Sequence, residues 1–425
     1  MAAVFAILAS LIVVTPAFTV IDGPFVRGCV LAYTAALIMM TALVLRPVDL
    51  ARLTHLTRPI TALACLPALW MLIQIVPLPG GWLAHSIWES ASSALSRPVE
   101  ATISVDIGAT LLSLCWYAMA LAAALATAAV ALDRQRADVI FSLLTACAAV
   151  SAVAMLGLST IHLQYVIPIE RTQVASIAVI GLLLSYATGI RAYQHRTMHG
   201  ERNKKPEIGT LIPFAASAVS FMVCLAAIAT EPNAAVIFAS VAGIGTLLSI
   251  TVIRRLRLGN WGKSGIAAAA LICVAGFFAI NPANKDVDAT LALSTQPPAS
   301  VAIVERMLTD AKLGGTGAGT FGALWPIYRN TLDVQPRAAT TAAASTAIEM
   351  GRPFLWTTVI LALLAAFALY RRSLLRGRDY FYSGTGAGCI LSLLILSFAN
   401  AAIFGLALSL LSAMVCGLAL ARSKG

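Results

Sequence analysis

Three glycines in the spacing G-x-G-x-x-G stand out as residues that could bind a ligand. They are Gly317, Gly319 and Gly322, within KLGGTGAGTFGALWPIYRN at 312–330. A dinucleotide-binding loop needs a β-strand before the glycines and an acidic ribose ligand about 20 residues later. The preceding segment, ASVAIVERMLTDAKL, instead has apolar residues at helical spacing. The pattern therefore indicates a tight glycine turn, a loop whose backbone N–H groups bind an anion, or both.

The elements that hold this loop follow from the composition of the chain. It has 425 residues, of which 60% are hydrophobic and only 11% charged. This composition excludes an ordinary soluble globule. A membrane-spanning helix needs roughly 20 mostly apolar residues, so we expect an all-α membrane helix bundle with about twelve spans, whose backbone hydrogen bonds are internal. The predicted spans are 2–20, 28–45, 59–78, 108–131, 139–159, 172–190, 210–229, 235–253, 264–280, 353–370, 381–399 and 403–421.

Positive charge falls in alternate loops, which predicts the orientation of the spans. The basic loops would be cytoplasmic, together with both termini. Because the net charge of +11 is spread over short loops, it is explained by topology and does not indicate nucleic-acid binding. The residues concerned are Arg46, Arg52, Arg58, Arg134, Arg136, Arg191, Arg196, Arg202, Lys204, Lys205, Arg254, Arg255, Arg257, Lys263, Arg371, Arg372, Arg376, Arg378, Arg422 and Lys424.

Two segments on the opposite side are long enough to have a role of their own. Residues 80–107 contain Trp82, Trp88 and spaced apolar residues, which suit a helix lying at the membrane surface. Residues 281–352 form the largest soluble piece. The expected organisation is therefore nine spans in 1–280, one large periplasmic loop at 281–352, and three spans in 353–425.

Cysteines and histidines indicate neither disulfides nor a metal site. Each of the eight cysteines falls inside a predicted span, and no C-x-x-C spacing occurs. The five histidines are scattered; only His195 and His199 are four residues apart, in a polar loop. We predict no metal and no cofactor.

Several short segments occur in an order that carries a family resemblance. They are ERM at 305–307, GTGAGTF at 315–321, WPIYR at 325–329 and IEMG at 348–351, just before a span. In addition, TISVDIGATL at 102–111 opens a span after the first outside loop, and ERTQVA at 170–175 supplies Arg171. This order resembles the large periplasmic loop and neighbouring segments of the O-antigen ligase and O-antigen polymerase superfamily.

The resemblance implies an enzyme of surface-polysaccharide assembly in the bacterial inner membrane. Such enzymes transfer a glycan from a polyprenyl diphosphate to a hydroxyl of a saccharide or lipid-linked acceptor, without nucleotide or metal. A chain-length regulator is a further expected partner.

The leaving diphosphate calls for arginines, whose planar guanidinium groups match its oxygens. The first candidates are Arg171 and Arg329, and the second are Arg306 and Arg352. Each of these side chains could instead contact lipid headgroups. Glu349 is the nearest carboxylate that could act as general base, although capping or pairing at the start of the tenth span is the preferred interpretation. Trp325 and Tyr328 would stack on sugar or, preferably, anchor the loop at the interface. Gly317 and Gly319 complete the predicted binding set.

Two departures from the family pattern keep a second function open. The usual histidine position is Thr340, and the outer turn after 229, where many relatives carry an arginine, reads TEPN. A non-catalytic member of an export complex would show such losses, and a transporter is a further alternative. Transporters, however, usually contain internal repeats and intramembrane polar residues at discontinuous helices, whereas this sequence has no convincing internal repeat and few charges within its predicted spans.

Overall fold

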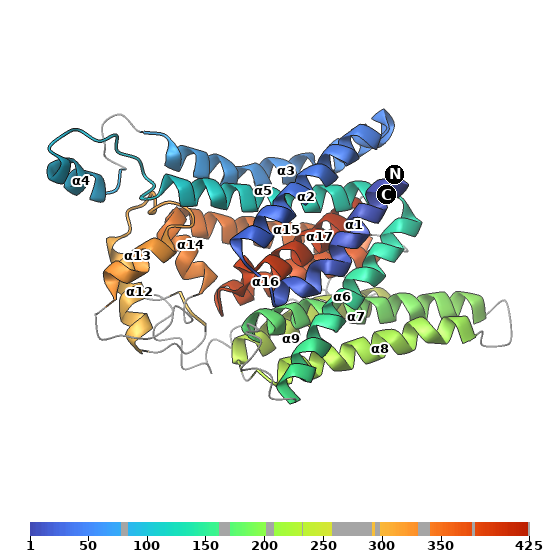
Figure 1. Ribbon diagram of the computed structural model, residues 1–425. Coiled ribbons are helices and arrows are strands. Elements are labelled where there is room, and N and C mark those ends of the chain that lie inside the picture. Colours follow the sequence, from blue (N-terminus) through green and yellow to red (C-terminus); the bar gives the residue numbers. More distant parts are fainter. Residues whose placement is uncertain are drawn as a thin grey trace.

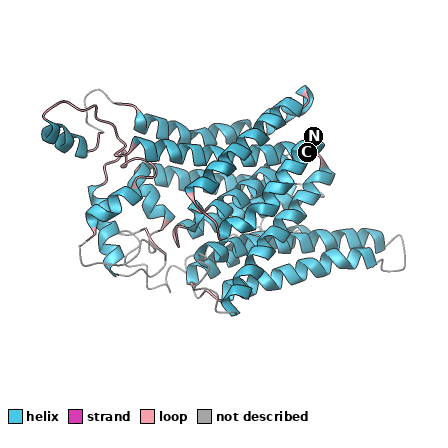
Figure 2. Ribbon diagram, viewed as in Figure 1, coloured by secondary structure: helices cyan, strands magenta, loops and turns pink. Residues whose placement is uncertain are grey.

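Every element of the described structure is helical (Figure 2). The computed structural model describes residues 1–77, 84–160, 171–200, 208–231, 233–256, 291–293, 298–329, 341–375 and 379–423. The helices are α1 (Ala2–Val14), η1 (Thr15–Thr19), α2 (Pro24–Val44), α3 (Pro47–Ile75), α4 (Ile87–Leu95), α5 (Ile107–Val130), α6 (Arg134–Thr160), α7 (Arg171–Gly200), α8 (Ile208–Ala229), α9 (Ala234–Arg255), α12 (Pro298–Asp310), α13 (Phe321–Tyr328), α14 (Ala342–Met350), α15 (Arg352–Leu375), α16 (Tyr380–Ser397), η4 (Ala402–Phe404) and α17 (Leu406–Ala421).

Nine stretches of helix in these described ranges are long and apolar enough to cross a membrane. Two shorter apolar helices, Leu63–Ile75 and Leu406–Ala421, coincide with the third and last predicted spans. The predicted span at 264–280 lies outside the described residues. The apolar helices indicate a membrane protein.

Helix α3 begins well before the apolar run that predicted it. Its first turn carries Pro47 and Asp49, and both residue types favour a helix start. The helix therefore includes a polar start, and the part of it that is described as an apolar helix is Leu63–Ile75.

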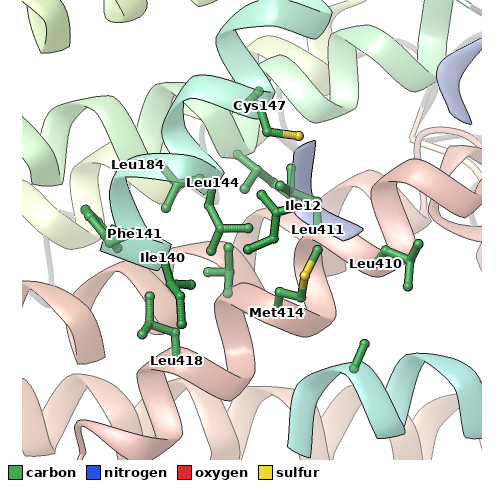
Figure 3. Close-up of a cluster of buried hydrophobic side chains, with 14 of the residues drawn as sticks. Ile12, Ile140, Phe141, Leu144, Cys147, Leu184, Leu410, Leu411, Met414 and Leu418 are labelled. Atoms are coloured by element: carbon green, nitrogen blue, oxygen red, sulfur yellow. The ribbon is translucent and has the colours of Figure 1, made fainter. Parts of the chain in front are cut away.

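The centre of the bundle is built around α7 and α17. In the apolar window of α7, 78% of residues are buried, against 17% in that of α15, which identifies α7 as an inner helix. Leu411 and Met414 of α17 lie in the same buried cluster as Phe141 and Leu144 of α6 (Figure 3). A side chain at Gly417 would come within 2.1 Å of the carbonyl oxygen of Ala124, so glycine permits α5 and α17 to touch.

Alternate loops meet at opposite ends of the bundle. At one end, the N–H of Leu293 bonds the carbonyl of Phe398, and that of Ala342 bonds the carbonyl of Asn400. At the other end, Arg134 pairs with Asp379 at 2.9 Å, and Arg191 with Asp138 at 2.9 Å. Figure 1 shows α12, α13 and α14 gathered at the first end, and both chain termini away from it. We call the first the cap end and the second the basic end.

Helices α12, α13 and α14 form a small unit with its own hydrophobic core, which we call the helical cap. Its core extends onto Leu355 of α15, the helix that directly follows α14. The segment Leu291–Leu293, which precedes α12, also packs near the end of α16 because the N–H of Leu293 bonds the carbonyl of Phe398. The cap is therefore attached to the ends of apolar helices. Its buried core residues are Leu291, Ile303, Val304, Met307, Leu308, Phe321, Leu324, Trp325, Ala343, Ala344, Ala347, Ile348 and Leu355.

Candidate functional site

The glycine loop is held in a conformation that side chains would obstruct. Gly315, Gly317 and Gly319 have φ angles of +77°, +106° and +78°, a region that L-residues rarely adopt. A Cβ at Gly317 would lie 2.4 Å from the Ser104 hydroxyl oxygen, and one at Gly315 would lie 2.3 Å from the Glu349 carbonyl oxygen. The glycines therefore allow close contact with the start of α5 and the end of α14.

Gln74, near the end of α3, is the centre of this contact. Its side chain is fully buried. The amide nitrogen donates to the carbonyl oxygens of Gly314, at 3.0 Å, and Glu349, at 2.9 Å. The amide oxygen accepts from the N–H of Ala318 at 3.1 Å, and the main-chain oxygen accepts from the N–H of Ser104 at 3.0 Å. Gln74 thus joins α3 to the glycine loop and the end of α14 through its side chain, and to Ser104 through its main chain.

Backbone bonds complete the junction between the loop and its neighbours. The N–H of Val105 donates to Thr316 at 2.8 Å, and the N–H of Thr316 donates to Ile348 at 3.0 Å. The N–H of Gly317 donates to the carbonyl of Glu349 at 2.9 Å. Since this amide is already bonded within the protein, the contacts favour the tight-turn interpretation over anion binding at Gly317.

Glu349 caps α13 in this structure, a helix that the sequence analysis did not connect with it. Its carboxylate oxygen Oε1 accepts from the N–H of Phe321 at 3.1 Å. Phe321 is the first residue of α13, and the preceding Thr320 makes no side-chain cap bond. A carboxylate is favourable at a helix N-terminus.

The four candidate arginines are all exposed. Arg306 lies on α12, Arg329 directly follows α13, and Arg352 begins α15, where its guanidinium donates to the carbonyl of Leu308 at 3.5 Å. Arg171 begins α7, a different part of the fold. Exposed guanidinium groups can reach either a phosphate ligand or lipid headgroups.

Asn400 connects the helix of Arg171 to the helix of Glu349. Its side-chain nitrogen donates to the Ser176 hydroxyl of α7 at 3.4 Å, and its carbonyl accepts from Ala342 at the start of α14 at 3.1 Å. Glu349 lies seven residues further along α14, about 10 Å at 1.5 Å per residue. The cap end therefore brings α7 and α14 together, with Glu349 at the far end of α14.

The structure corrects the expectation for Trp325. Its side chain is only 7% exposed and packs on Phe321 with ring centroids 5.6 Å apart. It stabilises the helical cap from inside and is available neither to a sugar nor to the membrane interface. Tyr328 is half-buried, and burial together with a hydrogen bond to Asp310 raises the pKa of its hydroxyl.

A clasp that the sequence analysis did not predict joins segment 84–105 to the glycine loop. The Lys312 ammonium donates to the carbonyl of Ala84 at 2.7 Å, and the N–H of His85 donates to Thr102 at 3.2 Å. Nδ1 of His85 accepts from the N–H of Ile87 at 3.2 Å, at the start of α4. Burial and the nearby Lys312 lower the pKa of His85.

Gln74 was also missed, although its sequence carries a signal. It is the one carboxamide in the apolar run Leu63–Ile75, and a polar side chain in a span usually has a specific partner. Thr340, at the family's histidine position, lies outside the described residues. Within the described ranges, no three His, Cys, Asp or Glu residues are placed to hold a metal ion.

No protein-family model and no curated protein matches this chain.

Proposed function

We propose that this protein is a membrane glycosyltransferase of bacterial surface-polysaccharide assembly. It would transfer a glycan from a polyprenyl diphosphate to an acceptor hydroxyl at the cap end, as a polymerase or a ligase. The proposal places the protein in the inner membrane, with the cap end periplasmic and both termini cytoplasmic. Its main support is a helical cap attached to the ends of apolar helices, with three exposed arginines on or beside it: Arg306 on α12, Arg329 directly after α13, and Arg352 at the start of α15. A lipid-linked donor needs a site of this kind, at the boundary between hydrocarbon and water.

In the proposed reaction the acceptor oxygen forms a bond to the anomeric carbon of the donor sugar. The bond from that carbon to the diphosphate oxygen breaks, and its electron pair leaves with the diphosphate. Arg171 and Arg329 would stabilise the developing negative charge through charge-assisted hydrogen bonds. The hydroxyl proton leaves to a base or to water. Neither nucleotide nor metal takes part in the proposed step.

The proposal gives Glu349 a positioning role instead of the general-base role. Its carboxylate bonds the first N–H of α13, and its carbonyl bonds Gln74 and Gly317. Through these bonds Glu349 would hold the glycine loop and α13 against α14, and α13 leads directly to Arg329.

The decisive experiment is the size profile of surface and secreted polysaccharide in a strain lacking the gene. Complementation would use wild type, Arg171→Ala, Arg329→Ala, and the control Arg371→Ala, an exposed arginine at the basic end. We expect wild type and the control to restore the glycan and the two test variants to fail despite normal membrane levels. Accumulated single repeat units would indicate a polymerase, and polymer remaining on its lipid carrier would indicate a ligase.

Full restoration by both test variants would contradict the catalytic proposal. That result would favour the transporter or the non-catalytic member of an export complex, since neither needs arginines for a leaving diphosphate. An unaltered glycan profile in the deletion strain would exclude all of these roles in that polysaccharide.

A further inference from the structure

The basic end contains an arginine whose hydrogen-bonding capacity is not satisfied by the described protein. Arg422 directly follows α17, and its guanidinium lies 6.0 Å from the ring centre of Tyr382. Its Nε and Nη2 atoms are buried and have no hydrogen-bond partner. A charged group whose buried N–H groups have no acceptor is costly, so a negative charge held close to the guanidinium would stabilise Arg422.

The acidic residues nearby already have basic partners. Asp138 accepts a hydrogen bond from the Tyr382 hydroxyl and pairs with Arg191 at 2.9 Å. Asp379 pairs with Arg134 at 2.9 Å. These two carboxylates of the basic end are thus engaged with other arginines.

A second arginine lies beside the first. Arg372, in the last turn of α15, donates from Nη1 to the hydroxyl of Ser423 at 2.9 Å, and Ser423 is the residue after Arg422. A neutral hydroxyl leaves the charge of Arg372 uncompensated. In the described ranges, no ion pair to a carboxylate involves either Arg372 or Arg422.

The surroundings of this pair suit an amphiphilic anion. Arg372 and Arg422 each lie at the end of an apolar helix, where headgroups meet hydrocarbon. Phe367, five residues before Arg372 on the same helix and therefore toward the hydrocarbon, is 63% exposed and offers apolar surface. The planar guanidinium group of arginine has paired N–H donors that match two phosphate oxygens. Basic pockets between membrane helices bind anionic headgroups.

We propose that Arg422 and Arg372 form a binding site for the phosphate of an anionic phospholipid headgroup, at the ends of α15 and α17. The phosphate is held by the positive charge of the two guanidinium groups, neither of which pairs with a carboxylate in the described ranges, and the acyl chains lie along the exposed apolar surface of α15 that includes Phe367. This site is at the opposite end from the helical cap and does not depend on the proposed transferase activity.

The test measures lipid binding to the full-length protein. Purified protein in neutral detergent is titrated with phosphatidylglycerol, and bound lipid is counted by native mass spectrometry. Parallel titrations use phosphatidylcholine and inorganic phosphate, because a lipid headgroup and a free anion share the same chemistry. We expect preferential, saturable binding of phosphatidylglycerol, with millimolar phosphate unable to displace it.

Variants locate the site. Arg422→Gln and Arg372→Gln should each weaken phosphatidylglycerol binding on the order of tenfold, the size of a lost charged hydrogen bond. Arg134→Gln, at the same end but paired with Asp379, should bind as wild type does. Arg422→Lys keeps the charge and should bind with intermediate affinity, which also guards against misfolding of the glutamine variant.

Equal binding of the two lipids by wild type would overturn the proposal. Unchanged affinity in both glutamine variants would do the same, as would an equal loss in Arg134→Gln. Displacement of the lipid by inorganic phosphate would assign the site to a free anion instead.

Discussion

The side-chain amide of Gln74 donates to the main-chain oxygen of Glu349 over 2.9 Å, joining α3 to α14 across 275 positions of sequence. The same amide bonds both sides of the glycine loop. A single buried carboxamide therefore contributes three of the bonds that hold the glycine loop and α14 against α3.

Replacing Gln74 by leucine should destabilise the protein. The substitution leaves the Ala318 N–H without its acceptor and the Gly314 carbonyl without the Gln74 donor, while the Glu349 carbonyl keeps only the bond from Gly317. Each unsatisfied buried group costs about 1–3 kcal/mol. We expect a clear loss in thermal stability of the purified protein. Gln135→Leu, the same change at an exposed position, should have little effect. Equal melting temperatures for the two variants would show that the network contributes nothing.

Alanine at Gly317 should be strongly unfavourable, since φ is +106° and the new Cβ would lie 2.4 Å from the Ser104 hydroxyl oxygen. The matched control is Gly28→Ala in α2, where nothing lies within 4 Å of the added Cβ. There, the higher helix propensity of alanine is worth up to about 1 kcal/mol. The two glycine-to-alanine changes should thus shift the melting temperature in opposite directions; shifts of the same sign and size would contradict the loop geometry.

Two substitutions at Glu349 separate capping from base catalysis. Glutamine keeps an oxygen that can accept from the N–H of Phe321, while alanine does not. If Glu349 acts as a cap, Glu349→Gln retains most glycan assembly, and Glu349→Ala lowers it together with stability, by about 0.5–2 kcal/mol. A stable Glu349→Gln protein with no activity would instead identify Glu349 as the base.

Acid should loosen the clasp at His85. Its pKa is lowered from the usual 6.5 by burial and by Lys312, with Asp310 acting in the opposite direction. The folded state therefore binds fewer protons than the unfolded state once the pH falls below about 6.5, and the stabilising contribution is lost towards the lower folded pKa. Protonation of Nδ1 would also remove the acceptor of the Ile87 N–H.

Hydrogen exchange in segment 84–105, compared at pH 5 and pH 7.5 after correction for intrinsic rates, measures this effect. We expect faster corrected exchange at pH 5 in wild type, and His85→Gln should remove the pH dependence. Equal protection of the wild-type segment at both pH values would contradict the clasp.

Reporter fusions test the proposed orientation. Alkaline phosphatase is active only outside the cytoplasm, so a fusion after Ser96 should be active and one after Arg255 inactive. The reverse pattern would place the helical cap in the cytoplasm and remove the lipid-linked donor from the proposed site.

The sequence by itself determined the helical, membrane-embedded character of this protein, since hydropathy is a local property summed over about 20 residues. It also predicted the helix before the glycine loop, because α12 repeats its apolar residues with helical spacing. Local patterns of this kind do not depend on partners distant in the chain.

Tertiary structure alone decided the partners of individual side chains. The sequence predicts Trp325 as an aromatic residue at the membrane interface, but in the structure it is buried together with residues of α12 and α14. Gln74 reads as one polar residue in an apolar run, and its role depends on contacts about 240 and 275 positions away. The sequence places Glu349 just before a span, yet its carboxylate accepts from the N–H of Phe321 in α13, 28 positions earlier. The free energy of these interactions comes from which groups meet in the folded chain, and sequence spacing carries no record of that.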